Sequence, residues 1–167
     1  MLESSPRETL PLGIGTPLHR GFMAGMALRA RHSPGDDERA RACFESARAH
    51  YEGEASSYPL DSLRHSDLGL LYAALGWRGA ALGEGFHAAR LRPESSDAIG
   101  GVTVSLRLAR IYALLGEAPE AVRLLEHLLK VPVDDWTGFS VNDLRLRPDW
   151  DAVRGDAGFQ RLVAAGE

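Results

Sequence analysis

The chain has 167 residues, of which 44% are hydrophobic and 25% are charged, and its formal net charge is −4. This is the composition of one ordinary globular domain, and the acidic balance argues against a nucleic-acid partner, because phosphate binding needs a basic face. The single cysteine, Cys43, excludes an internal disulfide framework and is compatible with a reducing cytoplasm. No apolar run reaches the length of about 18 residues that a membrane-spanning helix needs, so no membrane partner is expected.

Residues 1–17 predict an extended leader, because prolines and glycines recur there. The start of the chain lacks a basic stretch followed by an apolar stretch, so no secretory signal is expected. From residue 18 onward the apolar residues follow a helical period. Helices are expected at 18–32, from Asp36 or Asp37 to about 56, and near 61–75, 78–91, 97–115 and 118–130. Asp36 or Asp37 is expected to N-cap the second of these helices.

A short phrase occurs twice, 40 residues apart, as YAALG over 72–76 and YALLG over 112–116. A weaker copy ends at Gly35, and an alanine follows each of the glycines at an equal distance, at Ala40, Ala81 and Ala121. Self-similarity at such a period predicts a stack of helical hairpins. Each glycine is expected to end a helix in the left-handed conformation. Small residues should let the two helices of a hairpin approach closely, with Gly69 facing Ala81 and Ala109 facing Ala121.

These positions resemble the tetratricopeptide repeat (TPR), a helix–turn–helix unit of about 34 residues. The middle copy matches the signature at Leu68, Gly69, Tyr72, Gly76, Ala81, Ala88 and Pro93. The third copy matches at Leu108, Ala109, Tyr112, Gly116, Ala121 and Leu128. The first copy keeps Gly35, Ala40, Phe44 and Ala47, with Arg31 at the aromatic position. The 40- to 41-residue spacing places extensions within 51–59 and 94–100.

From about residue 20 to 163 the chain also resembles the C-terminal TPR module of bacterial multidomain signalling proteins. In those proteins the module follows a serine/threonine kinase, a winged-helix domain or a cyclase. The segments that carry this resemblance are 83–85, 95–98, 108–112 and 144–162. The chain contains none of those effector domains and has Gly158 where the tail usually carries an arginine. It is therefore expected to be a stand-alone adaptor or scaffold, or a fragment of a longer protein.

The resemblance implies an all-α fold, a right-handed α-solenoid of three TPR-like helical hairpins with a short helical C-terminal cap. The hairpins are expected at 18–56, 60–95 and 97–132, and the cap at 133–167. Ser140 and Asp156 are expected to N-cap short helices of the cap. The cap should cover the apolar end of the stack with Leu144, Leu146, Trp150, Val153, Phe159 and Leu162.

In such stacks the first helix of each hairpin lines the concave side. The residues expected in this groove are Arg29, Ser66, Asp67, Leu70, Ala73, Arg107, Arg110 and Ala113. Arg107 and Arg110 are expected at its exposed rim, one turn apart, where they could hold a carboxylate by bidentate hydrogen bonds. Asp67 could pair with one of them and leave the other for a ligand; the alternative is a solvated or internally paired face.

The lysine and asparagine clamp of chaperone-binding TPR proteins is largely absent, so a chaperone tail is not the expected partner. Among the matching positions, Gly25, Arg29, Asp67, Thr103 and Arg107, only Arg107 keeps the family's residue type.

No catalytic, cofactor or metal site is expected. The six histidines include no pair with the i, i+4 spacing of a helical zinc site, and His65, between Asp61 and Asp67, is interpreted as a helix-face residue. We expect a non-catalytic, cytoplasmic protein–protein interaction module that binds a peptide or partner helix in its concave groove. The alternative is a sensory or regulatory domain that binds a small peptide or metabolite and controls an associated kinase or transcription effector. The partner and the oligomeric state are left open.

Overall fold

The computed structural model describes residues 17–131 and 139–165, and every regular element in that part of the chain is a helix. The longer helices are α1 (Pro17–Ala30), α2 (Asp36–Ser57), α3 (Ser62–Ala74), α4 (Arg78–Leu91), α5 (Gly100–Leu114) and α6 (Ala118–Leu128). The short ones are α7 (Val141–Leu146), the 3-10 helix η2 (Pro148–Val153) and α8 (Ala157–Ala164). The all-α prediction is confirmed. The expected leader lies outside the described residues except for Pro17, which begins α1.

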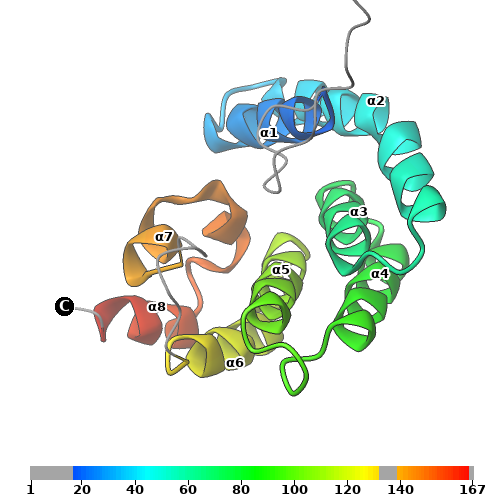
Figure 1. Ribbon diagram of the computed structural model, residues 1–167. Coiled ribbons are helices and arrows are strands. Elements are labelled where there is room, and N and C mark those ends of the chain that lie inside the picture. Colours follow the sequence, from blue (N-terminus) through cyan, green and yellow to red (C-terminus); the bar gives the residue numbers. More distant parts are fainter. Residues whose placement is uncertain (1–16, 132–138, 166–167) are drawn as a thin grey trace, which may run out of the picture.

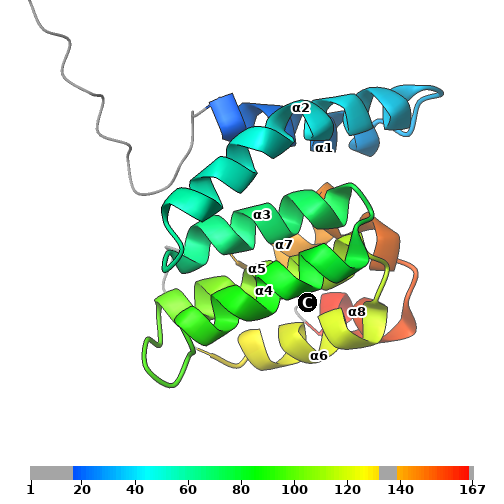
Figure 2. The ribbon, with the colours of Figure 1, turned by 90° about the vertical axis from the view of Figure 1, so that its right-hand side faces the viewer.

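The longer helices pack as successive pairs, α1 on α2, α3 on α4 and α5 on α6. The pairs follow one another round an arc, with α3 and α5 toward its middle and α4 and α6 on its outside (Figure 1). A side view shows α3, α4 and α6 running across the molecule in successive layers (Figure 2). Within the described residues, no helix has the length and apolar character needed to cross a membrane.

Two of the repeated glycines, Gly76 and Gly116, end helices as predicted, whereas α1 ends at Ala30 and Gly35 precedes α2 as its N-cap. Gly76 has φ 79°, its N–H donates to the Ala73 carbonyl (3.0 Å), and the Trp77 N–H donates to the Tyr72 carbonyl (2.8 Å). The same two hydrogen bonds recur 40 residues later at Gly116, which has φ 76°. This pattern satisfies the last carbonyls of a helix and requires a left-handed residue, which glycine adopts without a steric cost.

The predicted close approach within the second hairpin is also present. A Cβ on Gly69 would lie 3.1 Å from the Ala81 carbonyl oxygen and 2.8 Å from Ile111 Cδ1. Ala81, Ala109 and Ala121 are completely buried. Small residues therefore set the spacing of α3, α4 and α5.

The start of α2 differs from the prediction. Gly35, with φ 80°, occupies the N-cap position, and no side chain caps this helix. Asp36 is buried and instead forms ion pairs with Arg31 (3.3 Å) and Arg39 (3.1 Å). The prediction that Asp36 or Asp37 caps α2 is therefore wrong, because the chain enters the helix through a left-handed turn. The extension expected within 51–59 is mostly additional helix, since α2 continues to Ser57.

The C-terminal helices cover the last hairpin, with α8 against α6 and η2 against α5. The side chains that they bury almost completely are Leu144, Trp150, Val153 and Phe159. Ser140 and Asp156 N-cap α7 and α8 as predicted. Leu146 was expected to contribute to this core, but it is 81% exposed because it lies at the end of a six-residue helix.

Arg154 holds the turn between α7 and η2 together. Its guanidinium donates to the carbonyls of Leu144, Arg145 and Arg147 at 2.8–3.2 Å and to Asp151 at 2.7 Å. A single side chain thus satisfies several carbonyls that a short helix leaves without partners. The bonds fix η2 in the position from which it contacts both α5 and α1.

The two ends of the arc meet through η2. The inner helices α3 and α5 pack on each other, whereas α1 makes at most slight contact with α3 among the described residues and touches η2 instead. The first hairpin is therefore closed against the C-terminal segment.

Candidate functional site

Arg110 lies under η2 and is paired inside the molecule. Its guanidinium lies 2.8 Å from Asp149, whose side chain is only 3% exposed and also pairs with Arg147 at 2.9 Å. Burial lowers the pKa of Arg110, and the Asp149 carboxylate opposes that shift. The sequence suggested an exposed arginine left for a ligand's carboxylate. The structure corrects this expectation, because the carboxylate that Arg110 holds belongs to the chain itself.

η2 is firmly seated over Arg110. Trp150 and Phe159 are completely buried, with ring centroids 6.2 Å apart. Burying one such aromatic side chain contributes about 4–6 kcal/mol of transfer free energy before the entropy cost of ordering it. A ligand that displaced η2 to reach Arg110 would have to replace this free energy.

Asp67, which the sequence suggested could pair with Arg107 or Arg110, pairs with Arg107. Their closest atoms are 2.9 Å apart, and Arg107 also donates to the Leu63 carbonyl at 3.0 Å. Both side chains remain partly exposed, at 23% for Arg107 and 40% for Asp67. The pair joins α5 to α3 and supports the inner face.

Ser66 and Leu70, also expected in the groove, are buried. The Ser66 hydroxyl donates to the Ser62 carbonyl at 2.8 Å, within its own helix. Ala73 and Ala113 are buried as well. Most of the inner face expected to contact a ligand is therefore packed against the protein.

Arg29 is the predicted groove residue that lies at an open cavity. Its guanidinium donates to the Ala74 carbonyl (2.5 Å) and stacks over the Phe44 ring, 5.1 Å from the centroid. Burial lowers the pKa of Arg29, and nearby Asp37 opposes the shift. These contacts hold Arg29 of α1 against Phe44 of α2 and the end of α3.

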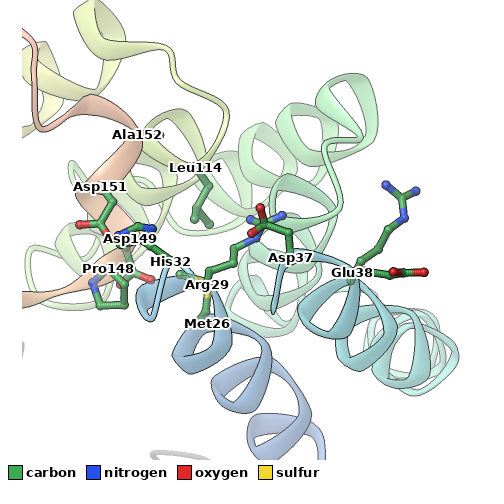
Figure 3. Close-up of a pocket in the computed structure, with 11 residues that line it drawn as sticks. Met26, Arg29, His32, Asp37, Glu38, Leu114, Pro148, Asp149, Asp151 and Ala152 are labelled. Atoms are coloured by element: carbon green, nitrogen blue, oxygen red, sulfur yellow. Dashed lines mark ion pairs between the residues drawn. The ribbon is translucent and has the colours of Figure 1, made fainter. Parts of the chain in front are cut away.

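The cavity, here called the cleft, has a volume of about 570 Å³ and lies between the first hairpin and η2. Its lining residues are Met26, Arg29, His32, Asp37, Glu38, Arg41, Leu114, Pro148, Asp149, Asp151 and Ala152. Figure 3 shows Asp37 on one side, Asp149 and Asp151 on the other, and Leu114 between them. The cleft thus combines apolar surface with charged groups of both signs.

His32 and Asp151 bridge α1 and η2 beside the cleft. The His32 Nε2 atom lies 3.7 Å from Asp151 Oδ2. His32 also has a positive φ of 50°, which a non-glycine residue adopts at some cost in conformational energy. The turn after α1 therefore brings this imidazole to the edge of the cleft.

Sequence reasoning missed Asp149 and Asp151 as site residues. They flank Trp150, for which the sequence favours a role in the cap of the last hairpin over a place in a partner site. The alternation of acid, tryptophan and acid is typical of a segment that buries one side chain and directs its neighbours elsewhere. Nothing local in the sequence shows that this segment also reaches α1, because that contact joins residues more than a hundred positions apart.

His65 takes part in a separate polar contact. Its Nδ1 lies 2.6 Å from Glu84 and its Nε2 lies 3.1 Å from the Pro59 carbonyl oxygen. Asp61, which the sequence places near it, instead N-caps α3. Among the described residues, no group of three or more histidine, cysteine or acidic side chains is arranged to hold a metal ion.

Comparison with known proteins identifies no relative of this chain. No family model, no curated protein and no solved structure matches this chain significantly. The site is therefore argued from its own geometry.

Proposed function

We propose that the protein is a TPR-type, right-handed α-solenoid of three hairpins that acts in the cytoplasm as a non-catalytic protein–protein interaction module. The two matching helix ends at Gly76 and Gly116 support the repeat assignment, since they recur with the same hydrogen bonds 40 residues apart. Stacks of this kind usually function by binding.

The observation that carries the binding proposal is the cleft between the two ends of the arc. Its volume of about 570 Å³ falls in the range of about 300–1,000 Å³ that is typical of ligand pockets. Two turns of an α-helix with side chains occupy roughly 1,000 Å³. The cleft therefore favours a short extended peptide segment over a partner helix.

A panel of random short peptides displayed on phage tests this proposal. For each peptide that is retained, fluorescence anisotropy measures its affinity for the wild type and for the Ala152→Trp variant. In this variant an indole replaces an exposed alanine of the cleft wall. Peptides that bind the cleft should lose at least about tenfold in affinity. The control is Ala80→Trp, at an exposed alanine on α4 outside the cleft, which should bind normally. Equal binding by both variants would contradict the proposal.

The second candidate is a sensory or regulatory domain whose ligand, a small peptide or metabolite, controls an associated effector. It is favoured by the position of the cleft, because a ligand that contacts α1, α2 and η2 together would hold the two ends of the arc in place. A bound peptide should then slow hydrogen exchange in α1 and η2. Unchanged exchange in both helices would favour simple docking.

A further inference from the structure

The ionic groups that line the cleft are unequally engaged. Arg29 is held by the Ala74 carbonyl and the Phe44 ring. Arg41 lies 4.0 Å from Glu45, at the edge of an ion pair. Arg29 therefore already has partners within the protein, whereas Arg41 is exposed and only marginally paired.

The carboxylates at the cleft are less fully paired. Asp37 and Glu38 are exposed and form no ion pair among the described residues. Asp151 accepts hydrogen bonds from Arg154 through Oδ1, while its Oδ2 has only His32 nearby, at 3.7 Å. Asp149 is different, because Arg110 and Arg147 both hold it. Apart from the exposed Arg41 guanidinium, the unused hydrogen-bonding capacity of the cleft therefore lies in carboxylate oxygens, which accept and do not donate.

Apolar surface lies between these carboxylates. Met26 from α1, Leu114 from α5 and Pro148 from η2 contribute to the wall, and Figure 3 shows Leu114 between Asp37 and Asp151. A side chain that fits must present an aliphatic stem and a donor-rich cationic end. Lysine and arginine have this combination, because their methylene stems pack on apolar surface while the charged end reaches polar groups.

From this complementarity we infer that the cleft recognises a basic residue, lysine or arginine, within a peptide segment of the partner. The inference rests on the proposed peptide-binding function. The aliphatic stem of this basic residue lies along Met26, Leu114 and Pro148, and its cationic end contacts the carboxylates of Asp37 and Asp151. Glu38, which is also exposed at the cleft, adds a further carboxylate on the α2 side.

The test uses the cleft-dependent peptides from the display experiment. Such peptides should share a lysine or arginine at one position, and replacing that residue by norleucine should weaken binding about tenfold or more. Replacement by glutamate should abolish binding. Affinity should also fall as the salt concentration rises, because salt screens the exposed carboxylates.

In the protein, the combined Asp37→Asn and Glu38→Gln substitutions should weaken binding of the basic peptide about tenfold and leave binding of the norleucine peptide unchanged. Both side chains are exposed, so the variant should fold, and its thermal transition checks this. Glu126→Gln removes one carboxylate charge from an exposed position on α6, outside the cleft, and should bind like the wild type.

Three results distinguish the possibilities. Loss of basic-peptide binding in the Asp37→Asn, Glu38→Gln variant alone supports the inference. Some peptides could lose binding to Ala152→Trp and yet share no basic residue, or bind the Asp37→Asn, Glu38→Gln variant normally. Such peptides overturn the inference and leave the proposed function standing. Failure to find any peptide that depends on the cleft overturns both.

Discussion

The second and third hairpins and the junction between the first hairpin and η2 are built in different ways. In the second and third hairpins, the inner helices α3 and α5 pack directly on each other, and small residues such as Gly69 and Ala81 set the distances. At the junction, α1 packs on η2, where His32 lies near Asp151, and reaches the end of α3 through the hydrogen bond from Arg29 to the Ala74 carbonyl. The cleft lies at this polar, less regularly packed junction.

This difference indicates where binding capacity arises in the fold. Apolar packing between repeats fills space and buries residues such as Ser66 and Leu70, so it leaves little surface for a ligand. The first copy has Arg31 where the other two copies have Tyr72 and Tyr112, and its hairpin departs from the regular stacking. Loss of the regular inner contact gives η2 room to approach α1 and forms the walls of the cleft.

The largest expected effect lies in the C-terminal segment. Trp150→Ala should lower the free energy of unfolding by about 3–5 kcal/mol, because it leaves a cavity in a completely buried site. Leu146→Ala, at a side chain that is 81% exposed, should change it by less than about 0.5 kcal/mol. Urea denaturation measures both variants. Similar changes in unfolding free energy for the two variants would mean that the C-terminal helices do not pack on the last hairpin as described.

A somewhat smaller effect is expected for the buried ion pair beneath η2. Asp149→Asn removes the charge opposite Arg110 but keeps an acceptor oxygen, so it should cost about 1.5–3 kcal/mol of unfolding free energy. Replacing both residues, as Arg110→Met with Asp149→Leu, should recover much of this loss, since no unpaired buried charge remains. Equilibrium denaturation of the single and double variants gives the coupling free energy between Arg110 and Asp149. No recovery in the double variant would contradict this account of the pair.

The first hairpin offers a test by close approach. A Cβ on Gly25 would lie 2.3 Å from the completely buried Phe44 ring, so Gly25→Ala should force α1 away from α2 and cost about 1–3 kcal/mol. Gly83 has open space around it within α4, and Gly83→Ala should instead stabilise the protein by about 0.5–1 kcal/mol. Thermal unfolding, followed by circular dichroism, should show a lower melting temperature for Gly25→Ala and a higher one for Gly83→Ala. A stabilising Gly25→Ala would show that α1 is packed differently.

The smallest expected effect depends on pH and concerns the junction between α4 and α5. Burial acts to raise the pKa of Glu94, but hydrogen bonds from His127 (2.7 Å) and Ser105 outweigh it and hold the pKa below its ordinary value of 4.5. Because the pKa of Glu94 is lower in the folded state, ionised Glu94 stabilises the fold fully above its ordinary pKa of 4.5. This stabilisation is lost as the pH falls through the folded-state pKa. Glu94→Gln should therefore cost about 1 kcal/mol near neutral pH and less in acid. A difference that grows on acidification would contradict the assignment.

Local chemistry explains what the sequence predicted well. Gly76 and Gly116 end helices because of their own conformational freedom, and Ser140 and Asp156 cap helices through neighbouring N–H groups. These features depend on residues a few positions apart. The Asp36 or Asp37 cap failed because the left-handed Gly35 changes how the chain enters α2.

The candidate site could be predicted only in part, because it depends on contacts between distant segments. Arg29 was identified from its repeat position, and Asp67 was expected to pair with Arg107 or Arg110, of which the structure shows Arg107. The burial of Arg110 could not be foreseen, because it follows from the return of η2 to the inner face. The same return places Asp151 opposite Asp37 across the cleft (Figure 3).

Methyl-resolved NMR of the protein with a peptide selected by display tests the central claim, that the cleft is the binding site. The methyl signals of Met26, Leu114 and Ala152, which line the cleft, should shift on titration of the peptide. Those of Leu60 and Ile99, which are highly exposed on loops outside the cleft, should not. Shifts confined to Leu60 and Ile99, with the three cleft residues unchanged, would contradict the account.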